Sequence, residues 1–505
     1  MDLQEHGDRQ VRPLVLALDI GSSGIRAAVF DGQGREIDET QARVTRTLQS
    51  TTDGGAEEDA DLGVEQVASC IDSLVANCGE LCEQIELVAV SCFWHSLVGV
   101  DEHGNATTPV LGWADTRGAS AAKELRRTFD ERDYHSRMGC RLHASYWPAK
   151  LLWLRQEHSQ VYKSTKLWLG FAEYLSLRLF GDSTASVSMA SGTGLFNQRR
   201  CEWDPEFAVA LGLNAEVLPP VAKAGHVFHG LTDQYSTRWP QLRNARWYGA
   251  ISDGAANNIG AGCVNQRQAA LMIGTSGAMR VVWDGEPPHE LDFGLWSYRV
   301  DARRVVVGGA LSDGGGLYSW MRNVLAIEAN LEETERALSA MKPDEHGLTV
   351  LPFWAGERST GWHSEARGAV LGLTMHTNSL DILRAAMEAV AYRFARIKDS
   401  LSKFAPNLMI VAAGNALLAS PVWAHIVSDV LGSPIRLSTV REASSRGVVL
   451  LALEAEGKIE SVDMRVPYLS VIEPDMANHD SYRIGALRQQ QIYDRILGDE
   501  FEAKV

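Results

Sequence analysis

Two segments of the chain share one pattern of apolar and polar positions. Residues 14–32 read LVLALDIGSSGIRAAVFDG, and residues 268–285 read QAALMIGTSGAMRVVWDG. Each is an apolar run, a short Gly/Ser turn, a second run rich in β-branched or apolar residues, and an Asp-Gly pair. Such runs around a glycine-containing turn predict a β-hairpin. Because Gly274 follows Gly21 by 253 positions in matched surroundings, the sequence predicts a duplicated architecture.

The two predicted turns have the composition of anion-binding loops. Their backbone amides and hydroxyl groups point at whatever lies beyond the turn, and phosphate is the ligand that suits them best. The copies differ just before the turn, where the first has Asp19 and the second has Met272. Magnesium is usually held by one or two carboxylates together with phosphate and water. We therefore expect two similar domains facing a nucleotide, with Asp19 beside its phosphates.

The rest of the chain alternates strand-like and helix-like patterns, which is typical of an α/β protein. A third strand is expected near residues 35–47, and apolar residues three or four positions apart predict a helix over residues 64–81. The next strand is expected at residues 87–91. Because 505 residues exceed what one core usually supports, we expect two domains of roughly 250 residues each.

A polar and aromatic break follows this strand. The break, FWHS at residues 93–96, offers Trp94 and His95, and α/β sheets commonly bind ligands where a buried strand ends. Asp115 and Arg117 follow in the sequence WADTRG, and such a pair suits sugar hydroxyls or an anionic group. The alternative for each of these residues is a packed aromatic ring or one half of a surface ion pair.

Two further polar residues occur where predicted elements begin. Lys150 lies in the first turn of a helix expected to open after Pro148, in YWPAKLLWLRQEH. It is either solvated or held at a pocket rim by neighbouring tryptophans. Asp253 ends a short strand and precedes a helix of small residues, SDGAANNIGAG. A carboxylate in that position is well placed to take a proton from a bound hydroxyl, or it caps the helix.

The C-terminal half contains two small-residue loops, each between a strand and a helix. The glycine-rich loop within residues 305–323 includes Gly315, and glycine lets a backbone approach a nucleotide closely. The second loop, at residues 413–416, precedes a helix that Ser420 caps and Gly432 ends. We expect this second loop to border the base and ribose; a purely structural loop is the alternative.

Composition limits the possible partners. The chain has 48 Lys and Arg against 64 Asp and Glu, a net charge of −16. Such a field repels nucleic acid and anionic membranes, so an anionic ligand has to be held by local donors. The polar N-terminus and the lack of a long apolar run predict a cytoplasmic protein with no membrane partner. Seven cysteines without a CxxC pair are a poor disulfide framework, and Cys78 and Cys82 are expected to be buried helix residues rather than metal ligands.

Taken in order, these motifs resemble those of the FGGY carbohydrate kinases over residues 12–495. LDIGSSGIRAAVFD and IGTSG look like the two phosphate motifs of that family, SDGAANN like its catalytic-aspartate segment, and AAGNALLASPVW like its adenosine motif. The resemblance implies a duplicated actin-like ATPase fold of the ribonuclease H-like type, with a nucleotide cleft between the domains. It places a sugar-binding and catalytic domain at residues 12–264 and a nucleotide-binding domain at residues 265–496.

Within the family, the sequences HSLVGVDEHGN, WADTR and GERSTGWH look most like those of gluconate kinases. Trp94 departs from the methionine expected there, and Asn415 replaces a usual glycine. The resemblance implies that ATP phosphorylates a small sugar or sugar acid, D-gluconate first among them. In such a reaction magnesium and turn amides neutralise the phosphates while a base takes the proton of the attacking hydroxyl.

The resemblance also implies a role for individual residues. Asp253 is expected to be the base, and Asp19 to orient magnesium directly or through water. The residues expected to hold the phosphates are Gly21, Ser22, Ser23, Arg26, Gly274, Thr275 and Ser276, and those expected to flank the nucleoside are Gly315, Gly414 and Asn415. The residues expected to contact the acceptor are Trp94, His95, Asp115, Arg117 and Lys150, together with Asp253.

Two alternatives stay open from the sequence. The acceptor can be xylulose or another pentulose rather than gluconate. The same fold also serves chaperone ATPases, filaments and sugar-responsive regulators, which would not need a sugar-facing base; the presence of Asp253, WADTR and Lys150 favours a kinase. The expected partner is one small sugar or sugar acid, and the expected assembly is a homodimer.

Overall fold

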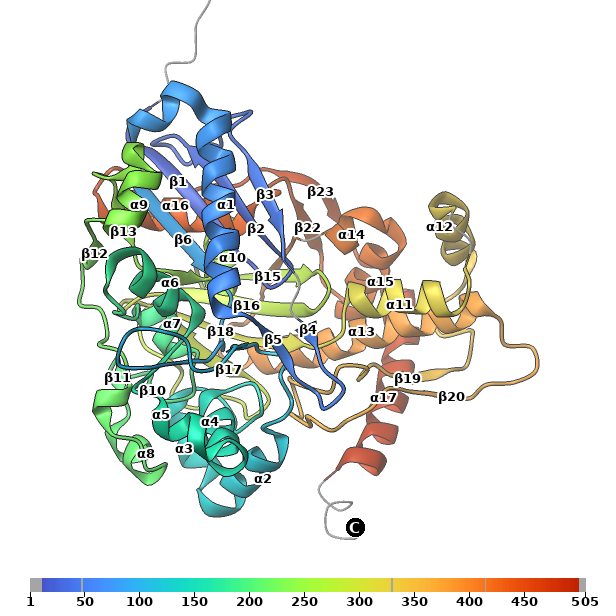
Figure 1. The fold of residues 1–505 in the computed structure, drawn as a ribbon. Coiled ribbons are helices and arrows are strands. Elements are labelled where there is room, and N and C mark those ends of the chain that lie inside the picture. Colours follow the sequence, from blue (N-terminus) through green and yellow to red (C-terminus); the bar gives the residue numbers. More distant parts are fainter. Residues whose placement is uncertain (1–10, 47–48, 328–329, 414, 499–505) are drawn as a thin grey trace, which may run out of the picture.

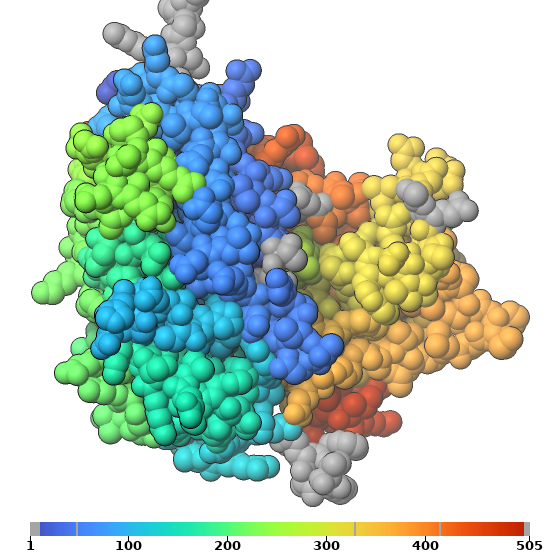
Figure 2. Space-filling view, viewed as in Figure 1, coloured from blue at the N-terminus to red at the C-terminus, as the bar shows by residue number. Residues whose placement is uncertain are grey.

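The protein is built from two α/β halves that lie side by side (Figure 1). The computed structural model describes residues 11–46, 49–327, 330–413 and 415–498. In the space-filling view the N-terminal half, blue to green, and the C-terminal half, yellow to red, form the two sides of the molecule (Figure 2). Each half contains a seven-stranded sheet. Across the described ranges, every helix is too short or too polar to span a bilayer.

The first sheet contains strands from the N-terminal half. Its order is β12-β13-β6-β1-β2-β3, with β14 also paired to β6. The strands are β1 (Leu14–Ile20), β2 (Gly24–Phe30), β3 (Ala42–Thr45), β6 (Ile85–Cys92), β12 (Val227–Phe228), β13 (Arg246–Tyr248) and β14 (Ile251–Ser252). The predicted hairpin is formed by β1 and β2, and β6 lies parallel to β1 on the other side.

The second sheet repeats this arrangement. Its order is β23-β22-β21-β15-β16-β18-β17. The strands are β15 (Gln268–Ile273), β16 (Gly277–Asp284), β17 (Trp296–Arg299), β18 (Arg304–Leu311), β21 (Met409–Ala413), β22 (Ile435–Ser438) and β23 (Tyr468–Ile472). In both sheets a hairpin is followed by two parallel strands and then an antiparallel one, so β15, β21, β22 and β23 correspond to β1, β6, β13 and β12.

The first sheet is covered on both faces, which explains why all of β1 is buried. Successive side chains of a strand point to opposite faces. One set of β1 side chains, Leu14, Leu16, Leu18 and Ile20, joins the core that contains α1 (Ala60–Cys78). The other set, Val15 and Ala17, packs with Val448, Val449, Ala452 and Leu453 of α16 (Ala443–Ala455). Helix α16 comes late in the chain but covers the N-terminal sheet, on the face opposite α1 (Figure 1).

Two helices, α10 (Asp253–Gly260) and α16, join the halves. They touch backbone to backbone at Gly260 and Gly447. A Cβ built on Gly260 would lie 1.8 Å from the carbonyl oxygen of Ala443, and one on Gly447 would lie 1.9 Å from that of Ala256. Only glycine permits this approach, so the distance between the two helices is fixed by the two missing side chains.

The remaining elements surround this frame. The shorter strands are β4 (Gln49–Ser50), β5 (Ala56–Glu58), β7 (Val98–Val100), β8 (Val110–Leu111), β9 (Leu167–Leu169), β10 (Phe196–Asn197), β11 (Glu202–Trp203), β19 (Thr349–Leu351) and β20 (Ala369–Leu371). The N-terminal helices are α2 (Ala119–Thr128), α3 (Glu131–Met138), α4 (Trp147–Glu157), α5 (Ser159–Ser164), α6 (Phe171–Phe180), α7 (Val187–Ser191), α8 (Pro205–Ala210) and α9 (Asp233–Arg238), with 3-10 turns η1 (Gly79–Gln84), η2 (Ala215–Val217) and η3 (Pro240–Leu242). The C-terminal helices are α11 (Gly315–Val324), α12 (Leu331–Ala340), α13 (Ser379–Ser402), α14 (Asn415–Ala419), α15 (Pro421–Leu431) and α17 (Met476–Leu497).

Most of the predicted elements form, with shifted ends. The third strand is only β3, four residues long, and the helix predicted over 64–81 is α1 followed by η1. Cys78 ends α1, and Cys82 is buried in η1. Helix α15 begins and ends as predicted: Ser420 accepts a hydrogen bond from the Trp423 amide, and Gly432 ends the helix with a left-handed φ of 54°.

The contact at Gly260 generates a prediction. In Gly260→Ala the new methyl group meets a backbone oxygen that cannot rotate away, so α10 and α16 have to separate. We expect a loss of about 1–3 kcal/mol in unfolding free energy and a lower kcat, both measurable by urea unfolding and steady-state kinetics. Gly249→Ala is the control, because its nearest neighbour is a side-chain carbon, Ser186 Cβ, at 3.3 Å. Equal stability of the two variants would contradict the backbone contact.

Candidate active site

A cavity of about 1630 Å³ lies between the two halves. Both Gly/Ser turns line it, as do the beginnings of α10, α11 and α16. Of the residues predicted to bind ligands, it is lined by Asp19, Gly21, Ser22, Ser23, Arg26, Trp94, His95, Asp253, Gly274, Thr275, Ser276 and Gly315. Asp115, Arg117 and Lys150 are not part of its lining.

The first hairpin presents a carboxylate and a guanidinium beside its turn. Asp19 and Arg26 are cross-strand partners in the β1–β2 register, and Arg26 Nη1 donates to Asp19 Oδ2 at 3.0 Å. The Gly21 amide donates to the Gly24 carbonyl at 2.9 Å and closes the turn. Burial raises the pKa of Asp19, and the charge of Arg26 opposes that rise. The turn thus brings hydroxyls, a cation and one carboxylate to the same end of the cavity.

The second hairpin is supported by the glycine-rich loop. The Gly315 amide donates to the Gly274 carbonyl at 2.7 Å, and the Gly316 amide donates to the Thr275 carbonyl at 3.0 Å. A Cβ on Gly314 would lie 2.6 Å from the Ser276 carbonyl oxygen. The three glycines therefore let the loop pack directly on the turn. This structural role adds to the predicted one, since Gly315 and Gly316 also line the cavity.

The structure separates the two roles considered for Asp253. Ser252 is the residue that caps α10, because its hydroxyl accepts a hydrogen bond from the Ala255 amide at 3.2 Å. Asp253 is the next residue, and its carboxylate lines the cavity while accepting from the Gly254 amide at 2.7 Å. Burial raises the pKa of Asp253 to about 6, with the nearby Arg280 opposing the rise. A carboxylate with that pKa is a stronger base than an ordinary aspartate and is still ionised at neutral pH.

The break after β6 is a turn held from several sides. Trp94 Nε1 donates to the Ser188 carbonyl at 2.9 Å, and Trp147 Nε1 donates to the Ser96 carbonyl at 2.7 Å. His95 has a left-handed φ of 68°, and its Nδ1 lies 2.5 Å from the Gly192 carbonyl. We assign the ring proton to Nδ1 on this contact, which leaves Nε2 as an acceptor. Burial lowers the pKa of His95 to about 3, so the ring is neutral.

Lys150 supports this turn from outside the cavity lining, and its predicted contact with the acceptor stays a prediction. Its side chain is 1% exposed. Its Nζ donates to the carbonyls of His95 at 2.7 Å, Leu111 at 3.2 Å and Gly112 at 2.8 Å. Burial lowers the pKa of Lys150 to about 7, but only the ammonium form has the three donors that these three carbonyls require.

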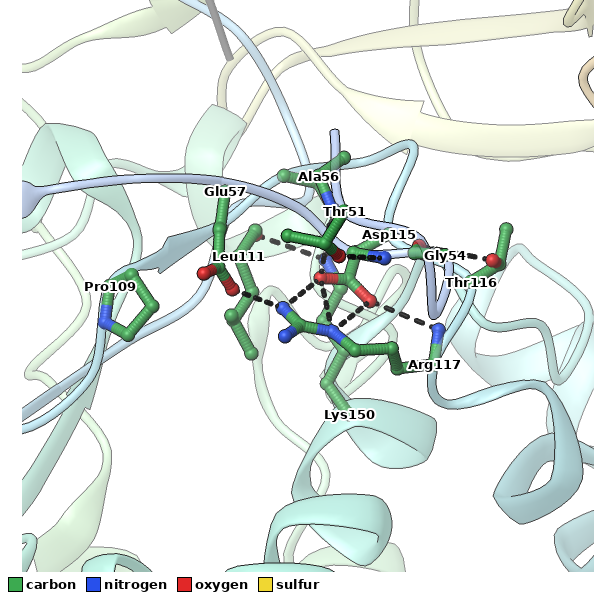
Figure 3. Close-up of polar contacts among 12 residues, drawn as sticks. Thr51, Gly54, Ala56, Glu57, Pro109, Leu111, Asp115, Thr116, Arg117 and Lys150 are labelled. Carbon is green, nitrogen blue, oxygen red and sulfur yellow. Dashed lines mark hydrogen bonds and ion pairs between the residues drawn. The ribbon is translucent and has the colours of Figure 1, made fainter. Parts of the chain in front are cut away.

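Asp115 and Arg117 form a part-buried ion pair outside the cavity lining. Figure 3 shows the guanidinium of Arg117 between two carboxylates. Its Nη2 lies 2.5 Å from Asp115 Oδ2 and 2.5 Å from Glu57 Oε2. The Ala56 amide donates to the same Asp115 oxygen at 3.3 Å. Both side chains join the loop after β8 to β5, and their predicted contact with the acceptor stays a prediction.

Two arginines that the sequence interpretation left unassigned line the cavity near Asp253. They are Arg280, on β16, and Arg358, in the segment GERSTGWH. Arg280 Nη1 and Arg358 Nε are buried and have no hydrogen-bond partner among the described residues. The sequence did hold a clue for Arg280, since it is a charged residue inside an otherwise apolar strand, GAMRVVWD, whose residues up to Trp283 are all buried.

The nucleoside end of the cavity is partly described. Ala413 and Ala416 line it, and a Cβ on Gly315 would lie 3.4 Å from the Ala416 Cβ. Asn415 is the first residue of α14. Gly414 lies outside the described residues, so its predicted contact with the nucleoside stays a prediction.

Comparison with known proteins agrees with this geometry. Residues 14–260 match the N-terminal domain of the FGGY family of carbohydrate kinases, and residues 269–456 match its C-terminal domain. The chain belongs to the FGGY family of carbohydrate kinases. It is therefore a carbohydrate kinase, with the two-domain actin-like fold predicted from the sequence.

Individual relatives are more distant. A gluconokinase of Bacillus subtilis is 26% identical over 462 residues, which cover 89% of each chain. Two solved structures from Lactobacillus acidophilus, a gluconate kinase and a ligand-bound xylulose kinase, each superpose with a TM-score of 0.87 at 23% identity. Both cover 97% of this chain, with 99% and 100% of their own. The likeness of these two structures shows the fold and leaves the acceptor open.

The donor set of the cavity fits a magnesium ion bound with ATP. Asp19 lines the cavity, and its charge raises the pKa of Asp253. Two carboxylates therefore lie near each other beside the first Gly/Ser turn. Hard cations of this kind take oxygen ligands from one or two carboxylates, phosphate and water. When bound, the ion would neutralise phosphate charge. Asp19 would hold it, directly or through water, while the hairpin amides bind the phosphates.

The hydrogen bonds of Lys150 predict how its replacement changes stability and KM. Lys150→Met leaves the buried carbonyl of His95 without a donor, whereas the carbonyls of Leu111 and Gly112 keep the amides of Leu97 and Asp115. An unmet buried group of this kind costs about 1–3 kcal/mol. We expect a lower unfolding temperature and a raised KM for every acceptor alike, because the His95 turn relaxes. Lys123→Met is the control, since Lys123 is exposed and pairs with Glu365 on the surface. A rise in KM confined to acidic acceptors, with unchanged stability, would mean that Lys150 contacts the acceptor itself.

Proposed function

We propose that the protein transfers the γ-phosphoryl group of ATP to the primary hydroxyl of D-gluconate, giving 6-phosphogluconate and ADP. The observation that carries the choice of a sugar acid is the charge at the acceptor end of the cavity. Arg280 and Arg358 lie there; the charge of Asp253 acts on both arginines and that of Asp313 acts on Arg358. In a chain of net charge −16, two buried arginine nitrogens without a partner among the described residues, Arg280 Nη1 and Arg358 Nε, favour an acceptor that carries an anionic group.

The relatives support the same acceptor. The gluconokinase of Bacillus subtilis matches over most of both chains. The alternative is a pentulose such as xylulose, because the xylulose kinase structure superposes equally well. A neutral ketose would bring no carboxylate to the unpartnered Nε of Arg358, and this difference in charge makes gluconate the better candidate.

In the proposed reaction the chain positions three groups in line. The turn amides and hydroxyls of both hairpins hold the phosphates of ATP, and the acceptor hydroxyl lies between Asp253 and the γ-phosphorus. As the hydroxyl oxygen bonds to phosphorus, its proton passes to Asp253 and the bond from the γ-phosphorus to the bridging oxygen of ADP breaks. Catalysis of this kind rests mainly on positioning and on charge stabilisation.

Asp253→Asn tests the base directly. The amide is nearly isosteric but cannot accept the proton, so we expect kcat to fall about 10²–10⁴-fold with ATP binding retained. ADP release is measured with gluconate, xylulose and other sugars and sugar acids, and ATP binding by calorimetry. Asp284→Asn is the control, because Asp284 ends the second hairpin and lies outside the cavity lining. Wild-type turnover in Asp253→Asn would remove Asp253 from the mechanism.

The pH profile provides an independent test. Asp253 has to be deprotonated to act, and burial raises its pKa to about 6. We therefore expect kcat/KM for the acceptor to fall as the pH drops through about 6, by about tenfold per unit below it. Circular dichroism over the same range checks that the fold persists. Activity that stays level down to pH 5 in the folded enzyme would show that a more acidic group acts as the base.

A further inference from the structure

The two arginines at the acceptor end have donors to spare. Arg358 Nη2 donates to the Leu311 carbonyl at 2.9 Å, and its guanidinium lies on the ring of Trp113 with 4.5 Å between the guanidinium carbon and the ring centre. Its Nε is buried without a partner, as is Nη1 of Arg280. An unpaired buried donor on a charged group is costly, and the cost is removed if a ligand brings an acceptor.

The charges of these arginines point the same way. Burial lowers the pKa of both groups, and the charge of Arg358 lowers the pKa of Arg280 further because like charges repel. Asp253 is the carboxylate that raises the pKa of Arg280. Two like charges enclosed in one cavity are stabilised by an anion that binds beside them. The acceptor end of the cavity is thus prepared for negative charge.

Several other cations near the cavity already have partners or are neutral, while Arg322 of α11 and Arg441, before α16, also line it. The ammonium of Lys150 and the guanidinium of Arg117 are occupied outside the cavity. His95 is neutral, with a pKa lowered to about 3 by burial. Arg26 and Arg43 also line the cavity, but they pair with Asp19 and Glu442 beside the first hairpin.

The two arginines differ in what surrounds them. Arg280 packs against the start of α10, where a Cβ on Gly254 would lie 3.1 Å from its Nε. Arg358 lies near two tyrosines, Tyr146 and Tyr298, whose hydroxyls are 2.6 Å apart, and near the carboxylates of Asp253 and Asp313. Arg280 therefore lies beside Asp253 at the start of α10, whereas Arg358 lies against aromatic side chains.

We propose that Arg358 binds the carboxylate of the acceptor and so determines the preference for a sugar acid over a neutral sugar. The inference rests on the proposed sugar-acid kinase activity and adds a residue to it. The attacking hydroxyl and the carboxylate are at opposite ends of the six-carbon chain. With the hydroxyl at Asp253, the carboxylate reaches the cation that lies away from the base. Arg280 remains beside Asp253, where it meets the charge of the transferring phosphoryl group.

Arginine suits this position for a geometric reason. Its planar fork can donate two parallel hydrogen bonds to a carboxylate, which a lysine ammonium cannot do. The ring of Trp113 and the hydrogen bond to Leu311 hold the plane of the guanidinium of Arg358, whose Nε stays without a partner among the described residues. The carboxylate would thus be recognised by orientation as well as by charge.

The test compares two acceptors that differ only at this end. Sorbitol is a six-carbon chain like gluconate, with a CH2OH group in place of the carboxylate. For Arg358→Gln we expect KM for gluconate to rise roughly tenfold to hundredfold, as for the loss of one charge-assisted hydrogen bond. We expect KM for ATP and the weak turnover of sorbitol to change little. Calorimetric binding of gluconate without ATP gives a second readout that does not depend on the chemical step.

Two further variants make the result specific. Arg358→Lys keeps the charge but loses the fork, so its KM for gluconate should fall between wild type and Arg358→Gln. Arg280→Gln should lower kcat with a smaller effect on KM for gluconate. Unfolding temperatures identify any variant that fails to fold. If Arg358→Gln fails to fold, the KM of Arg358→Lys for gluconate provides the test instead.

The outcomes separate this inference from the proposed function. A wild-type enzyme that phosphorylates xylulose but no sugar acid overturns both. If the wild type uses gluconate while the folded Arg358 variants keep its KM, the proposed function stands and the role of Arg358 is overturned. An equal loss on gluconate and sorbitol would make Arg358 structural, and a larger KM effect in Arg280→Gln would move the carboxylate to Arg280.

Discussion

The backbone contact between α10 and α16 is the constraint on which the whole site depends. Helix α10 begins with Asp253, and the turn before α16 carries Glu442, which pairs with Arg26 of the first hairpin. Ser444, in the first turn of α16, donates to the Asp253 carbonyl at 3.4 Å. With no side chain at Gly260 or Gly447 to hold the helices apart, Asp253 and both Gly/Ser turns are brought to one cavity.

The cations of this protein have two separate uses. Arg46 is buried beside Glu58, and its guanidinium packs against the rings of Phe93 and Phe171, 4.7 and 4.4 Å from their centres. Like Lys150, it holds the segment after β6 in place. Arg46 also keeps a buried Nη1 without a partner among the described residues, so a spare donor alone does not indicate a ligand site. What distinguishes Arg280 and Arg358 is that they also line the cavity.

The repeated hairpins, the caps of α15 and Asp253 were predictable because each rests on a local pattern: a turn, a helix start, or a strand end. Asp115, Arg117 and Lys150 were placed in the cavity for the same local reason, their nearness in sequence to aromatic residues. Their actual partners are carbonyls and carboxylates brought in by β5, β8 and the turn at His95. Sequence spacing does not encode such tertiary partners. The opposite case is Arg358, whose position depends on Trp113, far away in the chain.

Helix α16 comes late in the chain but covers the N-terminal sheet, and this has a consequence for the synthesis of the protein. Strands β1, β2 and β6 are synthesised early, but the apolar face formed by Val15, Ala17 and Leu87 is covered by a helix that ends only at Ala455. At about 5–20 residues per second the ribosome needs roughly 10–40 s to go from the end of α10 to the end of α16. During that interval the nascent N-terminal half carries an uncovered hydrophobic sheet face. Chaperone binding to this face and its misassembly can therefore end only when α16 has been translated, long after the sheet itself.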